Sequence, residues 1–185
     1  DYVRYIDIGA VSSYSPIINT TSSGAVTLKE SHGGAPVLQF DGVDDYAEVT
    51  YNALFNFERT DSFSVIAMLK TTDNVVGIIF EKTTNDANLA GYGLFMQSTG
   101  KIVAFVKSSS TSVISVETTS AVINNGSWHT VGFSYSGNSL ASGVLIYIDG
   151  VAVATTTLND TLTTSIIGTT PARFATRLAG TFPLD

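Results

Sequence analysis

Short runs of β-branched and aromatic residues recur along the chain, and clusters of Gly, Asn, Asp and Ser separate them. The spacing between runs is about 8–12 residues, which is typical of an all-β sandwich or barrel. No segment keeps the period of an amphipathic helix, whereas several runs alternate apolar and polar positions as half-buried strands do. The pattern therefore predicts an all-β fold.

Two runs indicate which faces of their strands are buried. The run Phe63–Leu69 has apolar residues on both faces, with Phe63 and Val65 on one and Ile66 and Met68 on the other. This arrangement predicts a central strand that is covered on both sides. A second run, Trp128–Tyr135, is predicted to bury His129, Val131, Phe133 and Tyr135.

The clearest local signal is a hairpin over Val144–Ala154. Two apolar strands are joined there by Asp149-Gly150, the kind of residue pair that two-residue type I′ turns prefer. Ser98-Thr99-Gly100 is a second predicted hairpin turn. The other predicted strands are Tyr2–Ile8, Ala25–Leu28, Val37–Phe40, Tyr46–Thr50, Val75–Glu81, Gly93–Gln97, Lys101–Lys107, Val113–Thr118 and Ser165–Gly168.

The length and composition of the chain exclude several classes of site and partner. We expect one domain over residues 1–185, long enough to bury a core without cross-links. Cysteine is absent, which excludes disulfides, a thiolate nucleophile and cysteine-based metal sites. The net charge of −7 argues against nucleic acid as a partner, because phosphate binding needs clustered Lys and Arg. No apolar run reaches about 18 residues, so membrane insertion is not expected.

The surface chemistry is unusual. Charged residues make up 14% of the chain, against about 25% in a typical soluble domain. Ser and Thr, roughly a quarter of the residues, supply a neutral polar surface instead. Such a surface favours an extracellular or cell-surface location.

Six motifs then follow one another in a fixed order. They are Leu38-Gln-Phe-Asp-Gly-Val-Asp-Asp-Tyr-Ala-Glu-Val49, Ser62-Phe-Ser-Val65, Ile79-Phe-Glu-Lys82, Gly91-Tyr-Gly-Leu94, Gly126-Ser-Trp-His129 and Ile146-Tyr-Ile-Asp-Gly150. Together they resemble the laminin-G-like domains of the concanavalin A-like jelly-roll family. The resemblance implies a jelly-roll sandwich of two curved antiparallel sheets.

In that family, a strand resembling Asp-Glu-Val-Arg-Ile-Tyr closes one sheet. Residues 180–185 resemble the start of this strand, left incomplete. Asp1–Asp7, within a possible exchanged or first strand over residues 1–9, resembles the strand itself. If the first strand of one copy fills the gap in another, copies join head to tail into a homo-oligomer or filament. The residues of this assembly strand are Tyr2, Val3, Arg4, Tyr5, Ile6 and Ile8. The alternatives are that Tyr2–Ile8 is the family's ordinary first strand and that the protein continues past Asp185.

No arrangement of residues predicts catalysis. Retaining glycoside hydrolases need two carboxylates about 5 Å apart, whereas four residues of strand separate Asp44 from Glu48 by about 13 Å. The two histidines, His32 and His129, are far apart in the sequence, and His129 is expected to be a packed structural residue. The protein is therefore predicted not to be an enzyme.

Calcium is the one cofactor that the sequence suggests. Asp41, Asp44 and Asp45 place carboxylate oxygens in one turn, and the resemblance implies that Asp185 lies near this turn, so that the four could form an oxygen-rich site. The alternative is that Asp41 and Asp44 hold the turn by hydrogen bonds to the backbone. Asn85-Asp86 with Asn88 is a second candidate loop.

Glycans are the remaining candidate partner. Lectin-like members of the superfamily stack aromatic rings on sugars, and Tyr92, Tyr135 and Tyr147 are candidates for this role, although strand tyrosines are commonly packing residues. N-glycosylation acceptors in form are Asn19, Asn125 and Asn159. Two functions are thus predicted: a structural subunit that polymerises by strand complementation or, alternatively, a carbohydrate- or protein-binding module of a larger adhesin or phage tail protein.

Overall fold

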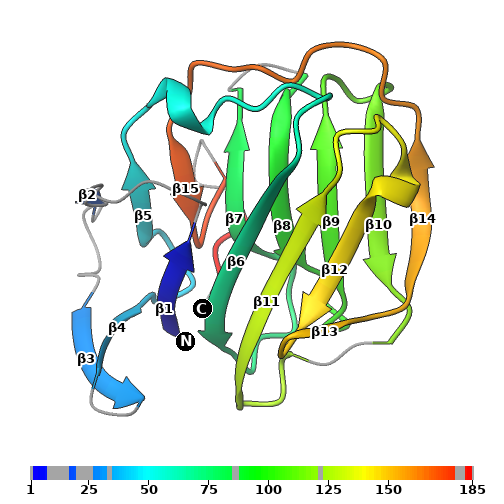
Figure 1. Ribbon diagram of the computed structural model, residues 1–185. Coiled ribbons are helices and arrows are strands. Elements are labelled where there is room, and N and C mark those ends of the chain that lie inside the picture. Colours follow the sequence, from blue (N-terminus) through cyan, green and yellow to red (C-terminus); the bar gives the residue numbers. More distant parts are fainter. Residues whose placement is uncertain are drawn as a thin grey trace.

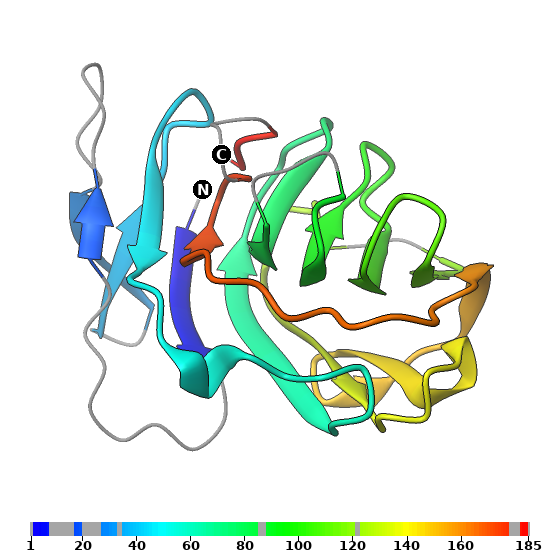
Figure 2. The ribbon, with the colours of Figure 1, turned by 90° about the horizontal axis from the view of Figure 1, so that it is seen from above.

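The chain forms two antiparallel β-sheets that pack face to face (Figures 1 and 2). The computed structural model describes residues 2–7, 17–19, 27–32, 35–84, 88–120, 123–177 and 182–184. The seven-stranded sheet has the order β13 (Val151–Ala152), β12 (Val144–Ile148), β11 (Trp128–Tyr135), β6 (Phe63–Lys70), β1 (Tyr2–Asp7), β4 (Ala35–Gln39) and β3 (Thr27–His32). The eight-stranded sheet has the order β14 (Thr155–Asp160), β10 (Val113–Thr118), β9 (Ile102–Lys107), β8 (Gly91–Met96), β7 (Gly77–Thr83), β15 (Ala172–Phe174), β5 (Tyr46–Val49) and β2 (Ile17–Asn19).

These two sheets confirm the predicted all-β jelly-roll sandwich. The only helical segments in the described part of the chain are two short 3-10 turns, Ala53–Phe55 and Ala141–Gly143. None of the described residues forms a helix of the length and apolarity needed to cross a membrane.

Alternation along β6 and β11 builds the centre of the core. Phe63 and Val65 are buried on the inner face of β6 and pair with Tyr135 and Phe133 of β11. The ring of Phe63 lies 4.7 Å from that of Tyr92, which comes from the opposite sheet. Aromatic contacts of this kind add to the free energy gained by burying apolar area, so they fix how the two sheets face each other.

The outer face of β6 differs from the prediction. Ile66 is 42% exposed and Met68 is half-buried, so the described part of the chain does not cover this face. A two-layer sandwich gives each sheet a single inner face, and an apolar residue on the other face remains in contact with water. The prediction of a strand covered on both sides was therefore wrong for β6. It describes β7 instead, where all seven residues are buried.

The Asp149-Gly150 turn forms as predicted. Both residues have positive φ angles, 52° and 81°, as a type I′ turn requires. The second arm of the hairpin is shorter than expected, because β13 ends at Ala152 and the chain then crosses to the other sheet as β14. β14 pairs with β10, a strand pairing that the sequence pattern did not predict.

Several strand boundaries also differ from the prediction. No strand forms over residues 165–168, and β15, which follows them, was not predicted. β7 begins at Gly77 rather than Val75. Gly77 lies against buried Leu184, whose side chain a Cβ at residue 77 would meet at 2.5 Å. Contacts with the end of the chain therefore help to decide where this strand begins.

The burial of β6 can be tested by substituting one residue on each face. Phe63→Ala should lower the free energy of unfolding by about 3–5 kcal/mol, because it leaves a cavity within the aromatic cluster. Ile66→Ala, on the exposed face of the same strand, is the matched control and should cost clearly less, about 1 kcal/mol or below. Denaturant unfolding monitored by circular dichroism measures both, and similar losses would contradict the assignment of faces.

Candidate functional site

The predicted assembly strand lies inside the seven-stranded sheet. β1 is bonded to β6 on one side, with Tyr2 opposite Lys70 and Asp7 opposite Ile66. On its other side, Tyr2 and Val3 pair with β4. Arg4 falls where the register with β6 shifts. Ile8, the last residue of the predicted strand, lies outside the described residues.

β1 connects two parts of the sheet that are otherwise separate. Among the described strands, β1 alone links the hairpin of β3 and β4 to β6, as the strand order shows (Figure 1). Removing β1 would leave one edge of β6 and one edge of β4 without backbone partners. Unpaired interior edges are costly and prone to associate with other chains, so this slot must contain a strand.

The acidic turn, residues 41–45, connects β4 of one sheet to β5 of the other. The Asp41 carboxylate accepts hydrogen bonds from the backbone N–H groups of Val43, at 2.9 Å, and Asp44, at 3.4 Å. Gly42 has a φ of 71°, which the tight turn requires. The predicted backbone hydrogen bonds are thus confirmed for Asp41.

The same turn brings three carboxylates together. One oxygen from each of Asp41, Asp44 and Asp45 lies within 4.8 Å of the others. Asp41 is exposed, Asp44 is half-buried and Asp45 is buried. Burial raises the pKa of Asp45, and the neighbouring carboxylates of Asp41 and Asp44 raise it further. Asp185, the fourth predicted ligand, lies outside the described residues, as do Asn85 and Asp86 of the second candidate loop.

His129 ties the Asp149-Gly150 turn to β11. Its Nδ1 lies 2.8 Å from Asp149 Oδ2 and its Nε2 lies 3.1 Å from Asn125 Oδ1. Asp149 Oδ1 accepts the backbone N–H of Thr130. Burial raises the pKa of Asp149, but the hydrogen bonds from His129 and Thr130 outweigh it, so the net pKa is lowered. The contacts agree with the packed structural role expected for His129. The side chain of His32 is not described.

The outer face of the eight-stranded sheet carries a charged row: Glu48, Arg173, Glu81 and Arg177. Arg173 pairs in register with Glu48 of β5 and Glu81 of β7, and its Nη2 lies 2.7 Å from Glu48 Oε2. Arg177 Nε donates to both oxygens of Glu81, whose side chain is 2% exposed. These residues point outward, because Ala172 and Phe174 on either side of Arg173 belong to the core. This row was not predicted from the sequence, although charges within apolar runs could have indicated its members.

Beside the charged row, β8 and β9 add an aromatic ring and a lysine. Phe105 lies against Gly93, where a Cβ would come within 2.7 Å of its ring. The Lys107 Nζ lies 5.2 Å from the centre of the same ring. Burial lowers the pKa of Lys107. The nearby charge of Glu81 raises this pKa and that of Arg177 lowers it, so Lys107, Glu81 and Arg177 lie close enough to interact electrostatically.

Lys82, near the end of β7, is a buried lysine. Its Nζ donates to Asn56 Oδ1 at 2.8 Å and to the carbonyl oxygen of Gly168 at 3.0 Å. Burial lowers its pKa to about 8. The ammonium therefore holds two loops together while it is charged, at a cost in desolvation.

Two of the predicted sugar-stacking tyrosines are in the core. Tyr92 and Tyr135 are 2% and 1% exposed, and their hydroxyls donate to the backbone carbonyls of Phe55 and Arg59. They cannot stack on a ligand, so that prediction was wrong for both. Tyr147, on β12, is half-buried.

The predicted glycosylation acceptors differ in their surroundings. Asn125 and Asn159 are both exposed. Asn125 Oδ1 accepts the backbone N–H of Ser127, and Asn159 Nδ2 donates to Ser115 Oγ at 2.8 Å. The side chain of Asn19 is not described. Glycosylation at these positions stays a prediction.

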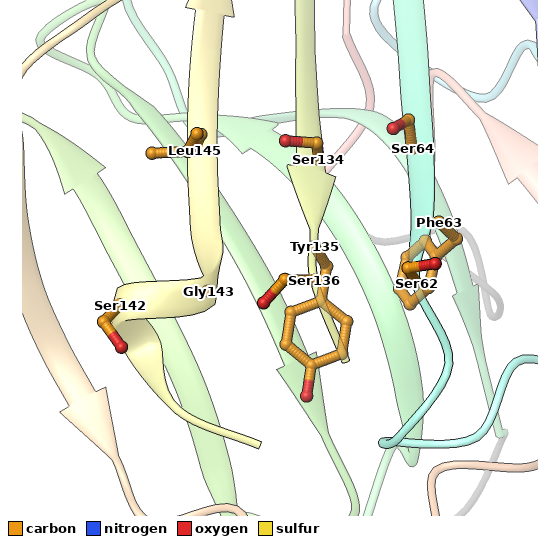
Figure 3. Close-up of a pocket in the computed structure, with 9 residues that line it drawn as sticks. All are labelled: Ser62, Phe63, Ser64, Ser134, Tyr135, Ser136, Ser142, Gly143 and Leu145. Carbon is orange, nitrogen blue, oxygen red and sulfur yellow. The ribbon is translucent and has the colours of Figure 1, made fainter. Parts of the chain in front are cut away.

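Figure 3 shows a serine-rich hollow at the neighbouring ends of β6, β11 and β12. Its lining residues are Ser62, Phe63, Ser64, Ser134, Tyr135, Ser136, Ser142, Gly143 and Leu145. The hydroxyls have no histidine or carboxylate beside them in this lining, and a serine needs such a base to act as a nucleophile. Glu48, one of the two carboxylates considered for glycoside hydrolysis, is held by Arg173.

The comparisons with known proteins agree with this architecture. The family model described as the concanavalin A-like lectin/glucanases superfamily, Laminin_G_3, matches residues 41–182. The chain belongs to this family. No curated protein is significantly similar to it in sequence.

Solved structures share the fold of this laminin-G-like domain at low sequence identity. Domains LG4-5 of the mouse laminin alpha1 chain match with a TM-score of 0.54 and 17% identity. The match covers 76% of this chain and 33% of the laminin chain. The CBM40 of a Ruminococcus gnavus IT-sialidase, bound to alpha2,6 sialyllactose, matches with a TM-score of 0.52 and 16% identity over 87% of both chains. An endo-beta-1,4-glucuronan lyase from the fungus Trichoderma reesei matches with a TM-score of 0.52 and 15% identity over 92% of this chain and 82% of that one.

The buried Lys82 ammonium predicts a specific pH dependence. In the unfolded chain its pKa returns to about 10.4, so between pH 8 and pH 10 the unfolded state binds more protons than the folded state, and stability rises with pH. The free energy of unfolding of the wild type should therefore rise by roughly 1–3 kcal/mol relative to Lys82→Met over this range. Denaturant unfolding at several pH values measures the difference, and a difference that does not change with pH would contradict the prediction.

Proposed function

We propose that this laminin-G-like domain is a non-catalytic structural subunit, extracellular or at the cell surface, whose copies join head to tail through β1. The observation that carries the proposal is the position of β1, the first strand of the chain, in the interior of the sheet between β6 and β4. A second copy contains the same strand. Its β1 would make the same backbone hydrogen bonds in the same slot.

β1 can fill the slot of its own copy or the slot of a neighbouring copy. Which of these two arrangements forms depends on the link that follows β1 and on the protein concentration. When each copy gives β1 to the next, the interface joins two different surfaces and has no symmetry that closes it. Such contacts propagate into a filament. The low content of charged residues, 14% of the chain, supports this proposal, because few charges would have to be buried where copies meet.

An engineered cross-link can distinguish the two arrangements. Tyr5 and Met68 are paired across β1 and β6, and the Cα atoms of paired residues lie about 4.5–5.5 Å apart, within the range that a disulfide spans. Because the chain has no cysteine, the double variant Tyr5→Cys, Met68→Cys has a single partner for each thiol. After oxidation, a non-reducing gel should show a ladder of covalent multimers.

The single variants Tyr5→Cys and Met68→Cys are the controls, since neither can form more than a dimer. A double variant that runs only as an internally cross-linked monomer, at concentrations where the protein is abundant, would contradict exchange of β1.

Truncation and a peptide give an independent test. A protein without residues 1–9 should form no filaments by electron microscopy, and an added peptide of residues 1–8 should shorten the filaments of the intact protein. The same peptide with Ile6→Pro should have no effect, because proline removes a ladder hydrogen bond from an interior strand. Filaments that persist in the truncated protein would argue against the proposal.

A second candidate function is binding of acidic glycans at the outer face of the eight-stranded sheet. Two half-buried cations there, Lys107 and Arg177, favour it, because cations suit a sugar that carries a carboxylate. The fold similarity to a CBM40 bound to sialyllactose adds support. This is the module that the alternative prediction describes.

Glycan binding is tested with sialyllactose and with glucuronic acid oligosaccharides. Calorimetry should show binding to the wild type and a loss of at least about tenfold in Lys107→Ala, since a charge-assisted hydrogen bond contributes about 1.5–3 kcal/mol. Lys101→Ala is the matched control, because Lys101 lies just before β9 of the same sheet and its ammonium is paired with Glu117. An absence of binding to both ligands would contradict this function, and release of unsaturated sugar products would contradict the non-catalytic assignment.

A further inference from the structure

We propose that Lys82 and Asn56 form a modification site, at which an isopeptide bond joins the Lys82 Nζ to the side-chain carbonyl carbon of Asn56. The Nζ lies 2.8 Å from Asn56 Oδ1, although the two residues are 26 positions apart in the chain. Lys82 is on β7, and Asn56 directly follows the 3-10 turn Ala53–Phe55. The bond would give a covalent cross-link to a chain that has no cysteine. It does not depend on how copies assemble.

The hydrogen bonds fix the direction in which the Asn56 amide faces. An ammonium group only donates, so the amide oxygen must face Lys82. The other end of the amide agrees with this orientation, because Asn56 Nδ2 donates to the Tyr51 hydroxyl at 3.0 Å. The nitrogen that would leave is therefore turned away from the lysine, toward a tyrosine that is 38% exposed. Released ammonia can reach solvent on that side.

The surroundings of Lys82 favour a nucleophilic amine. The residue is 3% exposed, and its Nζ lies 5.7 Å from the centre of the Tyr51 ring. The two oxygens to which it donates, Asn56 Oδ1 and the Gly168 carbonyl, are both neutral. Burial lowers the pKa of Lys82 to about 8. A desolvated lysine supplies neutral amine near physiological pH, and the neutral amine is the form that attacks a carbonyl.

Both partners are held in place before they react. The Asn56 backbone N–H donates to the Ala53 carbonyl oxygen at 3.0 Å. Tyr92 of β8 lies opposite Lys82 in the strand register, and its hydroxyl donates to the carbonyl oxygen of Phe55, the residue before Asn56. One tyrosine thus positions the loop and the lysine strand relative to each other. Groups that are held together in this way react as if at a very high concentration.

The step is a transamidation, and its atoms balance without a further reactant. The neutral Nζ attacks Asn56 Cγ, so that the Nζ–Cγ bond forms and the carbonyl electron pair moves to Oδ1. The Tyr51 hydroxyl, which lies against Nδ2, protonates this nitrogen, and a proton released from Nζ replaces the one that Tyr51 gives. The carbonyl then re-forms, the Cγ–Nδ2 bond breaks and ammonia leaves. Nothing is oxidised or reduced.

The position of the bond gives it a structural consequence. It would close a covalent loop over residues 56–82, which contains the whole of β6, the central strand of the other sheet. A cross-link of this kind stabilises the fold chiefly because it restricts the unfolded chain. The pH dependence of unfolding predicted for Lys82 applies to chains in which the bond has not yet formed.

Mass spectrometry of the full chain tests the proposal. After incubation at pH 9, the intact mass should fall below the sequence mass by one ammonia, and proteolysis should release a branched peptide that joins Lys82 to Asn56. The bond should form faster at pH 9 than at pH 6, because an amine with a pKa of about 8 is mostly neutral only at the higher pH. The cross-linked protein should melt about 7–14 °C above Lys82→Arg.

Four variants locate the bond. Lys82→Arg and Asn56→Ala should each keep the full sequence mass, since one lacks the nucleophile and the other lacks the amide. Tyr51→Phe should slow the reaction at least about tenfold, because it removes the proton donor. Lys107→Met is the matched control and should lose ammonia as the wild type does. Burial lowers the pKa of Lys107 as well, but its ammonium lies over the ring of Phe105.

Two outcomes would overturn the proposal. One is a wild-type protein that keeps its full sequence mass after days at pH 9. The other is a loss of ammonia that persists in Lys82→Arg, without the branched peptide in the wild type. That result would place the reaction elsewhere, for example in ring closure at Asn125-Gly126, which also releases ammonia. An unchanged rate in Tyr51→Phe would contradict the role given to its hydroxyl.

Discussion

An interior β-strand needs hydrogen-bond partners along both edges, and β1 meets this need between β6 and β4. The seven-stranded sheet depends on that position, because β3 and β4 reach the central strands only through β1. The arrangement makes β1 a structural requirement of this sheet. Whether the strand comes from the same copy or from a neighbour, the sheet has the same bonds. The proposed assembly through β1 relies on this equivalence.

The acidic turn and the charged row both contain buried carboxylates, but these carboxylates differ in whether a positive charge is paired with them. In the charged row, each carboxylate is matched by a guanidinium, so Glu81 can be buried while fully hydrogen-bonded. In the acidic turn, Asp45 is buried beside two further carboxylates, and one of its oxygens has no donor. A fold tolerates such an imbalance where a bound cation corrects it. Calcium binding at the acidic turn stays a prediction.

Part of the candidate site could be predicted from the sequence. The spacing of Asp41, Asp44 and Asp45 within five residues brings their carboxylates together in any tight turn, and the resemblance of residues 1–9 to a closing strand indicated a strand there. Charges within apolar runs could have indicated members of the charged row, but not their pairing, because Glu48, Glu81 and Arg173 are far apart in the chain and meet only through strand register. The burial of Tyr92 and Tyr135 was likewise decided by which sheet faces which.

The sequence by itself determined the fold class and the local turns. Alternation along β11 placed Val131 and Phe133 in the core, and Asp149-Gly150 specified its turn, because both depend on neighbouring residues alone. Only the tertiary structure decided that Ile66 faces water while β7 is buried throughout, and that β14 crosses to the other sheet. These outcomes depend on which segment covers each strand. Such contacts join residues that are distant in the chain, so a local pattern of apolar and polar positions cannot predict them.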